Sequence, residues 1–212
     1  MLAFERQHWQ AGYGLLAGVD EAGRGPLAGP VVAGAVAVEH ELLESLAPGV
    51  LLGLTDSKKL TERRREHYFG LLQEHPGILI GVGECSPAEI DDLNILRATY
   101  LAMRRAVESL PQCPGYVLVD GRPVTGLPCD STAIVRGDGR SLLIAAASVV
   151  AKVTRDRQML ALDDLYPAYG FARHKGYGSQ AHMQALFEYG PTPIHRRSFR
   201  PVREAEAIRR EP

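Results

Sequence analysis

Four acidic residues stand at or just after the ends of apolar segments. Asp20 and Glu21 follow the apolar run 15–19, Asp120 ends the run Y-V-L-V-D, and Asp138 comes shortly after S-T-A-I-V-R. A carboxylate at the tip of a buried strand is costly unless something pairs with it. Magnesium prefers such hard oxygen ligands, and two ions about 4 Å apart can promote an in-line phosphoryl displacement. We therefore predict a divalent-metal site, although a single strand-end Asp is also a common turn former or helix cap.

A glycine–arginine–glycine sequence follows the first acidic pair directly. Gly23, Arg24 and Gly25 sit between two apolar segments. Glycines allow main-chain N–H and C=O groups to approach a ligand closely. The sequence has neither the P-loop nor the dinucleotide-binding spacing, so a sharp turn after a strand remains the alternative.

Basic residues gather in several places along a chain of net charge −1. The clusters are Lys58, Lys59 and 63–65; Lys152, Arg155 and Arg157; 173–175, just before Tyr177; and 196–203. Basic residues with an interleaved tyrosine suit phosphate contacts and ring stacking. Solvated helix faces are the alternative for the first and last clusters.

The elements that must position these residues alternate in type. Apolar runs bounded by Gly or Pro predict strands at 15–20, 30–38, 77–85, 116–120 and 131–136. Helical spacing and caps predict helices at 61–74, from the S-P-A-E capping box at 86–89 towards 110, and at 141–165, 179–189 and 202–210. This order predicts an α/β fold with a mixed sheet covered by helices on both faces.

Composition is that of an ordinary globular protein, with 212 residues, 45% hydrophobic and 23% charged. The three cysteines form no C-x-x-C motif, so a disulfide framework and a zinc knuckle are both disfavoured. No signal peptide or bilayer-spanning run is evident. We therefore predict a soluble cytoplasmic protein with reduced thiols and no membrane association.

Six motifs occur in one order along the chain. They are D-E-A-G-R-G-P at 20–26, D-S-K-K-L at 56–60, L-V-D-G at 118–121, G-D-G-R-S at 137–141, A-A-A-S-V-V-A-K-V-T-R-D at 145–156 and H-K-G-Y-G-S at 174–179. Together these motifs resemble those of bacterial ribonuclease HII, the type 2 ribonuclease H. The resemblance implies a ribonuclease H-like, five-stranded mixed sheet. It also implies that residues 1–212 form one catalytic domain, in which about 165–212 is a helical C-terminal extension.

The same resemblance implies an activity and a set of site residues. The activity is endonucleolytic cleavage of RNA in RNA–DNA hybrids and on the 5′ side of single ribonucleotides in duplex DNA, which leaves 3′-hydroxyl and 5′-phosphate ends. This would serve ribonucleotide excision repair and DNA replication, and the protein would act as a monomer. The metal-binding and catalytic residues would be Asp20, Glu21, Asp120 and Asp138, which would hold Mg²⁺ or Mn²⁺, with two ions per site. The substrate-binding residues would be Gly23, Arg24, Gly25, Lys58, Lys59, Lys152, Arg155 and Tyr177.

Within that assignment, the glycine–arginine–glycine turn would read the ribose 2′-hydroxyl, and Tyr177 would help to recognise the RNA-to-DNA junction. Two other classes of function stay open. A nuclease on the same fold that ignores the 2′-hydroxyl is one. A protein that binds hybrid duplex without cutting is the other, and it is disfavoured because a polyanion binder gains nothing from clustered carboxylates.

Overall fold

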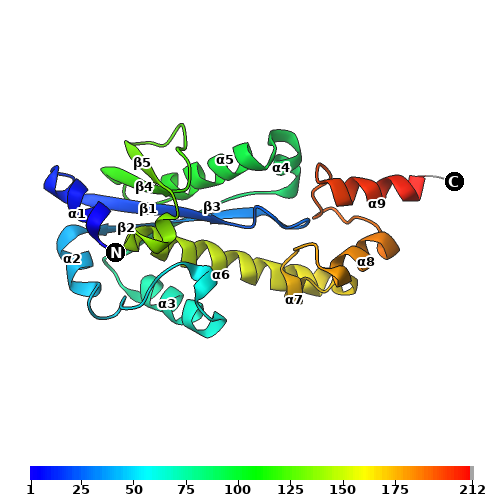
Figure 1. The fold of residues 1–212 in the computed structure, drawn as a ribbon, viewed down its shortest axis with the longest axis horizontal. Coiled ribbons are helices and arrows are strands. Elements are labelled where there is room, and N and C mark those ends of the chain that lie inside the picture. The colour runs from blue at the N-terminus through cyan, green and yellow to red at the C-terminus, as the bar shows by residue number, and fades with distance from the viewer. Residues whose placement is uncertain (211–212) are drawn as a thin grey trace.

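Five strands form one mixed sheet, in which the first strand of the chain lies at the centre. The order is β3-β2-β1-β4-β5, and the strands are β1 (Leu15–Ala22), β2 (Val31–Glu39), β3 (Leu79–Cys85), β4 (Tyr116–Asp120) and β5 (Ser131–Ile134). β1 pairs antiparallel with β2 and parallel with β4. This computed structural model describes residues 1–210, with side chains described to residue 208 (Figure 1).

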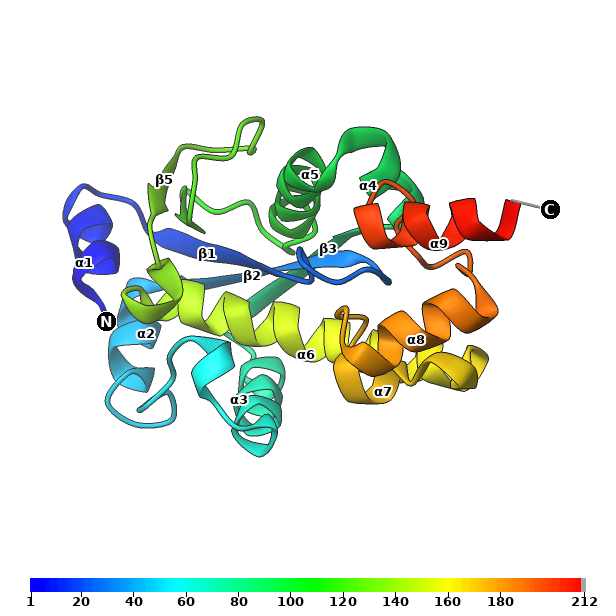
Figure 2. The same ribbon diagram turned by 45° about the vertical axis from the view of Figure 1, so that its right-hand side comes forward.

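Helices cover both faces of the sheet, which explains why β1 and β2 are apolar without alternation. The long helix α6 (Leu142–Leu165) packs on one face and α5 (Ile95–Glu108) on the other (Figure 2). α6 comes close to the sheet because Gly34 offers no side chain there. A Cβ on Gly34 would lie 2.6 Å from the carbonyl oxygen of Ala147. The same approach carries the middle of α6 towards the carboxyl end of β1.

The remaining helices surround this core. They are α1 (Ala3–Gln10), α2 (His40–Leu46), α3 (Glu62–Glu74), α4 (Pro87–Leu93), α7 (Phe171–His174), α8 (Gln180–Tyr189) and α9 (Arg200–Arg210). Short 3₁₀ turns lie at Ser57–Lys59, Gly137–Gly139 and Pro167–Tyr169. α7, α8 and α9 gather at the end of the molecule opposite α1 (Figure 1). No helix within residues 1–210 combines the length and the apolar character needed to cross a membrane.

The predicted mixed sheet with helices on both faces is confirmed, and most boundaries lie within two residues of their predicted positions. The predicted strand 131–136 ends early, at Ile134, because Arg136 adopts a left-handed conformation at φ 55°. The helices α1, α2 and α7 were not predicted. The predicted C-terminal extension reaches residue 212, and residues 211 and 212 lie outside the described part of the chain.

One prediction about a helix is wrong. The capping box at Ser86 does start a helix, with Pro87 as its first residue. That helix does not continue towards residue 110, because Asn94 adopts φ 68° and divides it into α4 and α5. The Asn94 side chain then caps α5 by accepting hydrogen bonds from the N–H groups of Leu96 and Arg97.

Candidate active site

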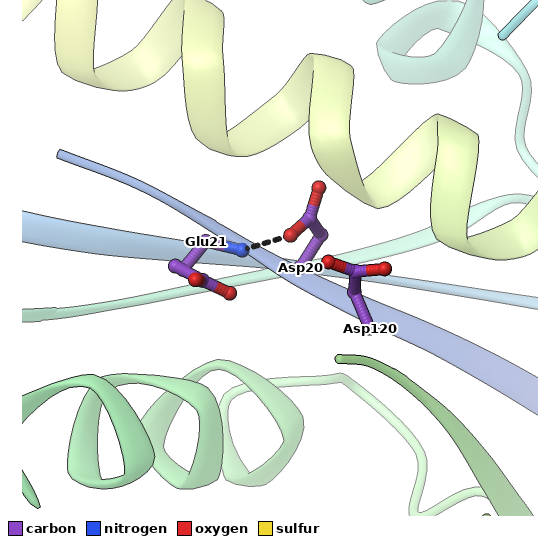
Figure 3. Close-up of side chains that lie close together, drawn as sticks. All are labelled: Asp20, Glu21 and Asp120. Carbon is purple, nitrogen blue, oxygen red and sulfur yellow. Dashed lines mark hydrogen bonds between the residues drawn. The ribbon is translucent and has the colours of Figure 1, made fainter. Parts of the chain in front are cut away.

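Three carboxylates meet at the carboxyl ends of two neighbouring strands. Asp20 and Glu21 come from β1, and Asp120 is the last residue of β4. One carboxylate oxygen from each residue lies within 4.8 Å of the others. Successive side chains of a strand point to opposite faces, and Figure 3 accordingly shows Asp20 directed towards α6 and Glu21 away from it. The group therefore straddles the tip of β1.

Main-chain donors fix the orientation of two of these carboxylates. The N–H of Glu21 donates to Oδ1 of Asp20 at 2.7 Å (Figure 3). The N–H of Gly137, in the turn after β5, donates to Oδ1 of Asp120 at 2.6 Å. The parallel pairing of β1, β4 and β5 brings these three chain segments to the same edge. The folded main chain thus aims the carboxylates before any ligand arrives.

The three carboxylates form a site that favours the binding of a cation. Burial raises the pKa of Asp20 well above its ordinary value, and the neighbouring Glu21 and Asp120 raise it further. Burial and then Glu21 raise the pKa of Asp120, although the Gly137 N–H opposes that shift. Oxygen ligands held this close, with their charge unsatisfied, suit a hard divalent cation such as Mg²⁺ or Mn²⁺.

Asp138 stands beside the group and outside the three-carboxylate set. Burial raises its pKa, and so do the carboxylates of Asp56 and Asp120. Lys58 faces the same acids. Burial opposes the charge of its ammonium group, but the carboxylates, Asp20 first, outweigh burial and raise the pKa of Lys58. The site therefore includes one lysine that offsets part of its negative charge.

Two open grooves meet at this acidic group. One, of about 610 Å³, is lined by Gly23, Arg24, Gly25 and Tyr177 together with Glu21, Ala22, Ser57, Lys58, Ile95, Lys152 and Arg155. The other, of about 530 Å³, runs past Asp120 on the α5 side and shares Glu21 and Arg24 with the first. The glycine–arginine–glycine turn and Tyr177 are thus brought to one groove from positions about 150 residues apart in the sequence.

The basic residues predicted to bind substrate differ in placement. Lys152 lies in the first groove and pairs with Asp156, Nζ to Oδ1 at 2.7 Å. Lys59 is largely exposed outside both grooves, with its Nζ 4.0 Å from Asp56. Arg155 is only 1% exposed, and its guanidinium donates to three main-chain carbonyls. Arg155 is therefore built into the wall of the groove.

Sequence reasoning missed three residues that shape the site. Ser148 of α6 hydrogen bonds to Asp20 and lies 2.6 Å from the hydroxyl of Ser57. It is a lone polar residue in the apolar run 142–151, which was an available signal. Asp56 caps the 3₁₀ turn at Ser57–Lys59 by accepting from the N–H of Lys58. The buried Arg196 carried no signal, since nothing in the sequence separates it from the exposed Arg197 beside it.

The fold and the acidic strand-tip site together define a ribonuclease H-like nuclease. The chain matches the family model described as ribonuclease HII over residues 17–202. It is 53% identical over 201 residues to a ribonuclease HII from Geobacter sulfurreducens, across 95% of this chain and 89% of that protein. It is 47% identical over 206 residues to a ribonuclease HII from Bacillus licheniformis, across 97% of this chain and 77% of that protein.

A solved structure gives the same result. The ribonuclease H2 from Pyrococcus horikoshii OT3 superposes with a TM-score of 0.76 at 30% identity, covering 93% of this chain and all of that one. The chain belongs to the ribonuclease HII family. It is accordingly an endoribonuclease that acts on the RNA strand of RNA–DNA hybrids.

Proposed function

We propose that this ribonuclease also cuts duplex DNA on the 5′ side of a single embedded ribonucleotide, leaving a 3′-hydroxyl and a 5′-phosphate. The observation that carries the proposal is the first groove, in which Gly23, Arg24, Gly25 and Tyr177 lie beside the three carboxylates. A tyrosine ring 47% exposed at a groove wall suits contact with a sugar or base. Discrimination between RNA and DNA needs a group that senses the 2′-hydroxyl, and the glycine-rich turn offers main-chain donors for it.

Divalent metal binding is the second part of the proposal. Asp20, Glu21 and Asp120, with Asp138 beside them, would hold Mg²⁺ or Mn²⁺, with two ions per site. The donor set supports this, since it consists of carboxylate oxygens and since burial, followed by mutual repulsion, raises the pKa of Asp20 and Asp120. When bound, such ions supply the positive charge that activates the attacking water and stabilises the departing 3′ oxygen.

Basic residues near the carboxylates bind and orient the substrate. Lys58 and Lys152 line the first groove and present ammonium groups to a phosphate backbone. Lys59 adds charge outside the groove, where it attracts the duplex. Arg24, half-exposed with its Nη1 3.1 Å from Oε1 of Glu21, lies where it can exchange that carboxylate for a phosphate oxygen. No side chain is required to form a covalent intermediate.

We also propose that the chain works as one domain. Main-chain hydrogen bonds from Leu27 to Gly176 and from Gly29 to Ile194 support this, because they join the residues after β1 to the C-terminal extension. We propose further that the protein acts as a monomer, because all the proposed site residues belong to a single chain.

The test is a cleavage assay on end-labelled duplex DNA that carries one ribonucleotide, with the all-DNA duplex and an EDTA sample as controls. The expected result is a single cut on the 5′ side of the ribonucleotide that requires metal. Equal cutting of the all-DNA duplex would favour a nuclease that ignores the 2′-hydroxyl. Binding without any cutting would favour a non-catalytic hybrid-binding protein. Cutting only within longer RNA runs would remove the junction role of Tyr177.

A further inference from the structure

Two arginine side chains lie buried under the glycine–arginine–glycine turn. Arg155 of α6 is 1% exposed, and Arg196, which precedes α9, is fully buried. The guanidinium of Arg196 donates to the carbonyl oxygens of four residues, and that of Arg155 donates to those of three. The acceptors for Arg196 are Gly23, Arg24, Gly29 and Pro30, and those for Arg155 are Ala28, Pro30 and Lys175. No carboxylate is a hydrogen-bond partner of either group within the described residues.

Burying two guanidinium groups costs the folded state free energy. Burial lowers the pKa of Arg155 to about 10. Burial, and then repulsion from Arg155, lower the pKa of Arg196 to about 9. Both groups therefore remain cations at neutral pH. Asp91 favours the charge of Arg196 and Asp156 that of Arg155, but neither carboxylate hydrogen bonds to the guanidinium, and a buried cation without a hydrogen-bonded carboxylate costs far more than an apolar side chain of the same size. A need to fill space does not explain why arginine occupies these two positions. The hydrogen bonds that the two side chains make to the glycine–arginine–glycine turn and to the residues that follow it do explain it.

The carbonyls that Arg196 binds determine which way the next N–H groups point. Every peptide bond in the described chain is trans, so each C=O is antiparallel to the N–H of the following residue. Arg196 Nη1 binds the carbonyl of Arg24 at 3.0 Å, and its Nη2 binds the carbonyl of Gly23. The N–H groups of Arg24 and Gly25 are therefore directed away from Arg196.

These two N–H groups are left for a ligand. Neither donates to an acceptor within residues 1–210. Both belong to residues that line the first groove, and Gly25 faces Tyr177, whose Cε1 would be 3.5 Å from a Cβ on Gly25. Two adjacent main-chain donors at an open groove, backed by two buried positive charges, suit an oxygen acceptor.

We propose that Arg196 is a positioning residue for ribonucleotide selection, and that Arg155 supports it. Arg196 binds the inner carbonyls of the turn and so holds the N–H groups of Arg24 and Gly25 towards the 2′-oxygen of the ribonucleotide. This rests on the proposed function of the first groove. The proposal also assigns a function to the C-terminal extension, because Arg196 hydrogen bonds to Gly23, which lies 173 residues earlier in the sequence.

The matched pair of variants is Arg196→Lys and Arg197→Lys. Lysine keeps the charge and loses the guanidinium fork. Arg197 is exposed and pairs with Glu206, Nη1 to Oε1 at 3.1 Å, so it controls for a neighbouring Arg→Lys change. Each protein is given two duplexes that differ at one position, a ribonucleotide or its 2′-deoxy-2′-fluoro analogue. The measurement is the ratio of the two kcat/KM values.

Arg196→Lys is expected to lower this ratio by about tenfold, which is the loss of roughly one well-formed hydrogen bond. Arg197→Lys is expected to keep the wild-type ratio. A uniform slowing of both substrates by Arg196→Lys, with the ratio unchanged, would overturn the proposal and leave Arg196 a purely structural residue. A wild-type enzyme that fails to cut the ribonucleotide duplex would instead refute the proposed function.

A second measurement uses the wild-type protein and does not depend on whether Arg196→Lys folds. Amide ¹H–¹⁵N signals of Arg24 and Gly25 are recorded in EDTA with the all-DNA duplex and with the ribonucleotide duplex. The two signals are expected to shift further with the ribonucleotide duplex than with DNA. Identical shifts with both duplexes would show that these N–H groups do not sense the 2′-oxygen, and the proposal would fall.

Discussion

Asp120 occupies a position where charge can be removed without disturbing the fold. Its Oδ1 accepts from the N–H of Gly137, and asparagine keeps that acceptor. Asp120→Asn is therefore expected to melt like the wild type. It should cleave the ribonucleotide duplex slower by on the order of 10³, because one of the charges that would hold the proposed metal is lost. The measurement is cleavage in Mg²⁺ beside a thermal melt, with the exposed Asp130→Asn as control. Near-normal cleavage by Asp120→Asn would remove Asp120 from the metal site.

Gly23 and Gly25 lie two residues apart, yet they differ in what a methyl group would meet. Gly23 has φ 94°, and a Cβ there would overlap the Arg155 side chain, whereas Gly25 has space and no positive φ. Gly23→Ala is expected to lower the free energy of unfolding by about 3 kcal/mol through backbone strain and steric overlap. Gly25→Ala should unfold like the wild type but bind the ribonucleotide duplex more weakly. Urea denaturation and a binding titration test this, and equal stabilities for the two variants would contradict it.

Among the helices, the break between α4 and α5 depends on one residue. Asn94 has φ 68° and ψ 161°, a conformation that costs energy for a residue with a Cβ, and its side chain caps α5. Asn94→Ala loses the cap and keeps the strain, so it is expected to lower the free energy of unfolding by about 1–2 kcal/mol. Asn94→Gly relieves the strain and should lose less. The urea midpoints of the two variants decide the matter, and an Asn94→Gly protein less stable than Asn94→Ala would refute it.

The same element illustrates what a sequence can predict. The capping box at Ser86 was readable because its residues interact within one turn. The strands β1 and β2 were readable because their burial on both faces leaves uninterrupted apolar runs. The break at Asn94 was not, since the flanking residues keep helical spacing on both sides and only the packing of α5 on the sheet requires a change of direction.

The candidate site divides in the same way. Asp20, Glu21 and Asp120 were predictable because strand tips at one sheet edge must converge, and the structure brings these three together. The strand ends say less about Asp138, which lies in a turn beyond β5. Ser148 and Arg196 act through contacts 91 and 173 residues away along the chain, to Ser57 and Gly23. No local pattern marks such contacts.

Within the C-terminal extension, two hydrogen-bonded histidines, His182 and His195, link Thr192 to the segment that carries Tyr177 into the first groove. The N–H of Thr192 donates to Nδ1 of His195 at 3.0 Å, so the proton of His195 is on Nε2. That group lies 3.0 Å from Nε2 of His182, whose Nδ1–H then donates to the carbonyl of Tyr177 at 2.9 Å. His174 stacks on His182 at 4.6 Å. A further proton on His182 or His195 would place two N–H donors face to face with no acceptor between them, which would break a hydrogen bond.

The hydrogen bonds of His182 and His195 predict that the folded protein loses stability in acid. Burial, and then repulsion from His182, lower the pKa of His195 from 6.5 to about 3. Below about pH 6.5 the unfolded state therefore binds a proton that the folded state excludes, and the free energy of unfolding falls as pH falls. Between pH 7 and pH 5 His195 alone should account for about 2 kcal/mol of that loss. Urea denaturation of the wild type and of His195→Asn at both pH values isolates this contribution, because titrating carboxylates affect the two proteins alike. A wild-type loss no larger than that of His195→Asn would mean that His195 already carries its proton in the folded protein, and the directional hydrogen bonding that reaches Tyr177 would have to be abandoned.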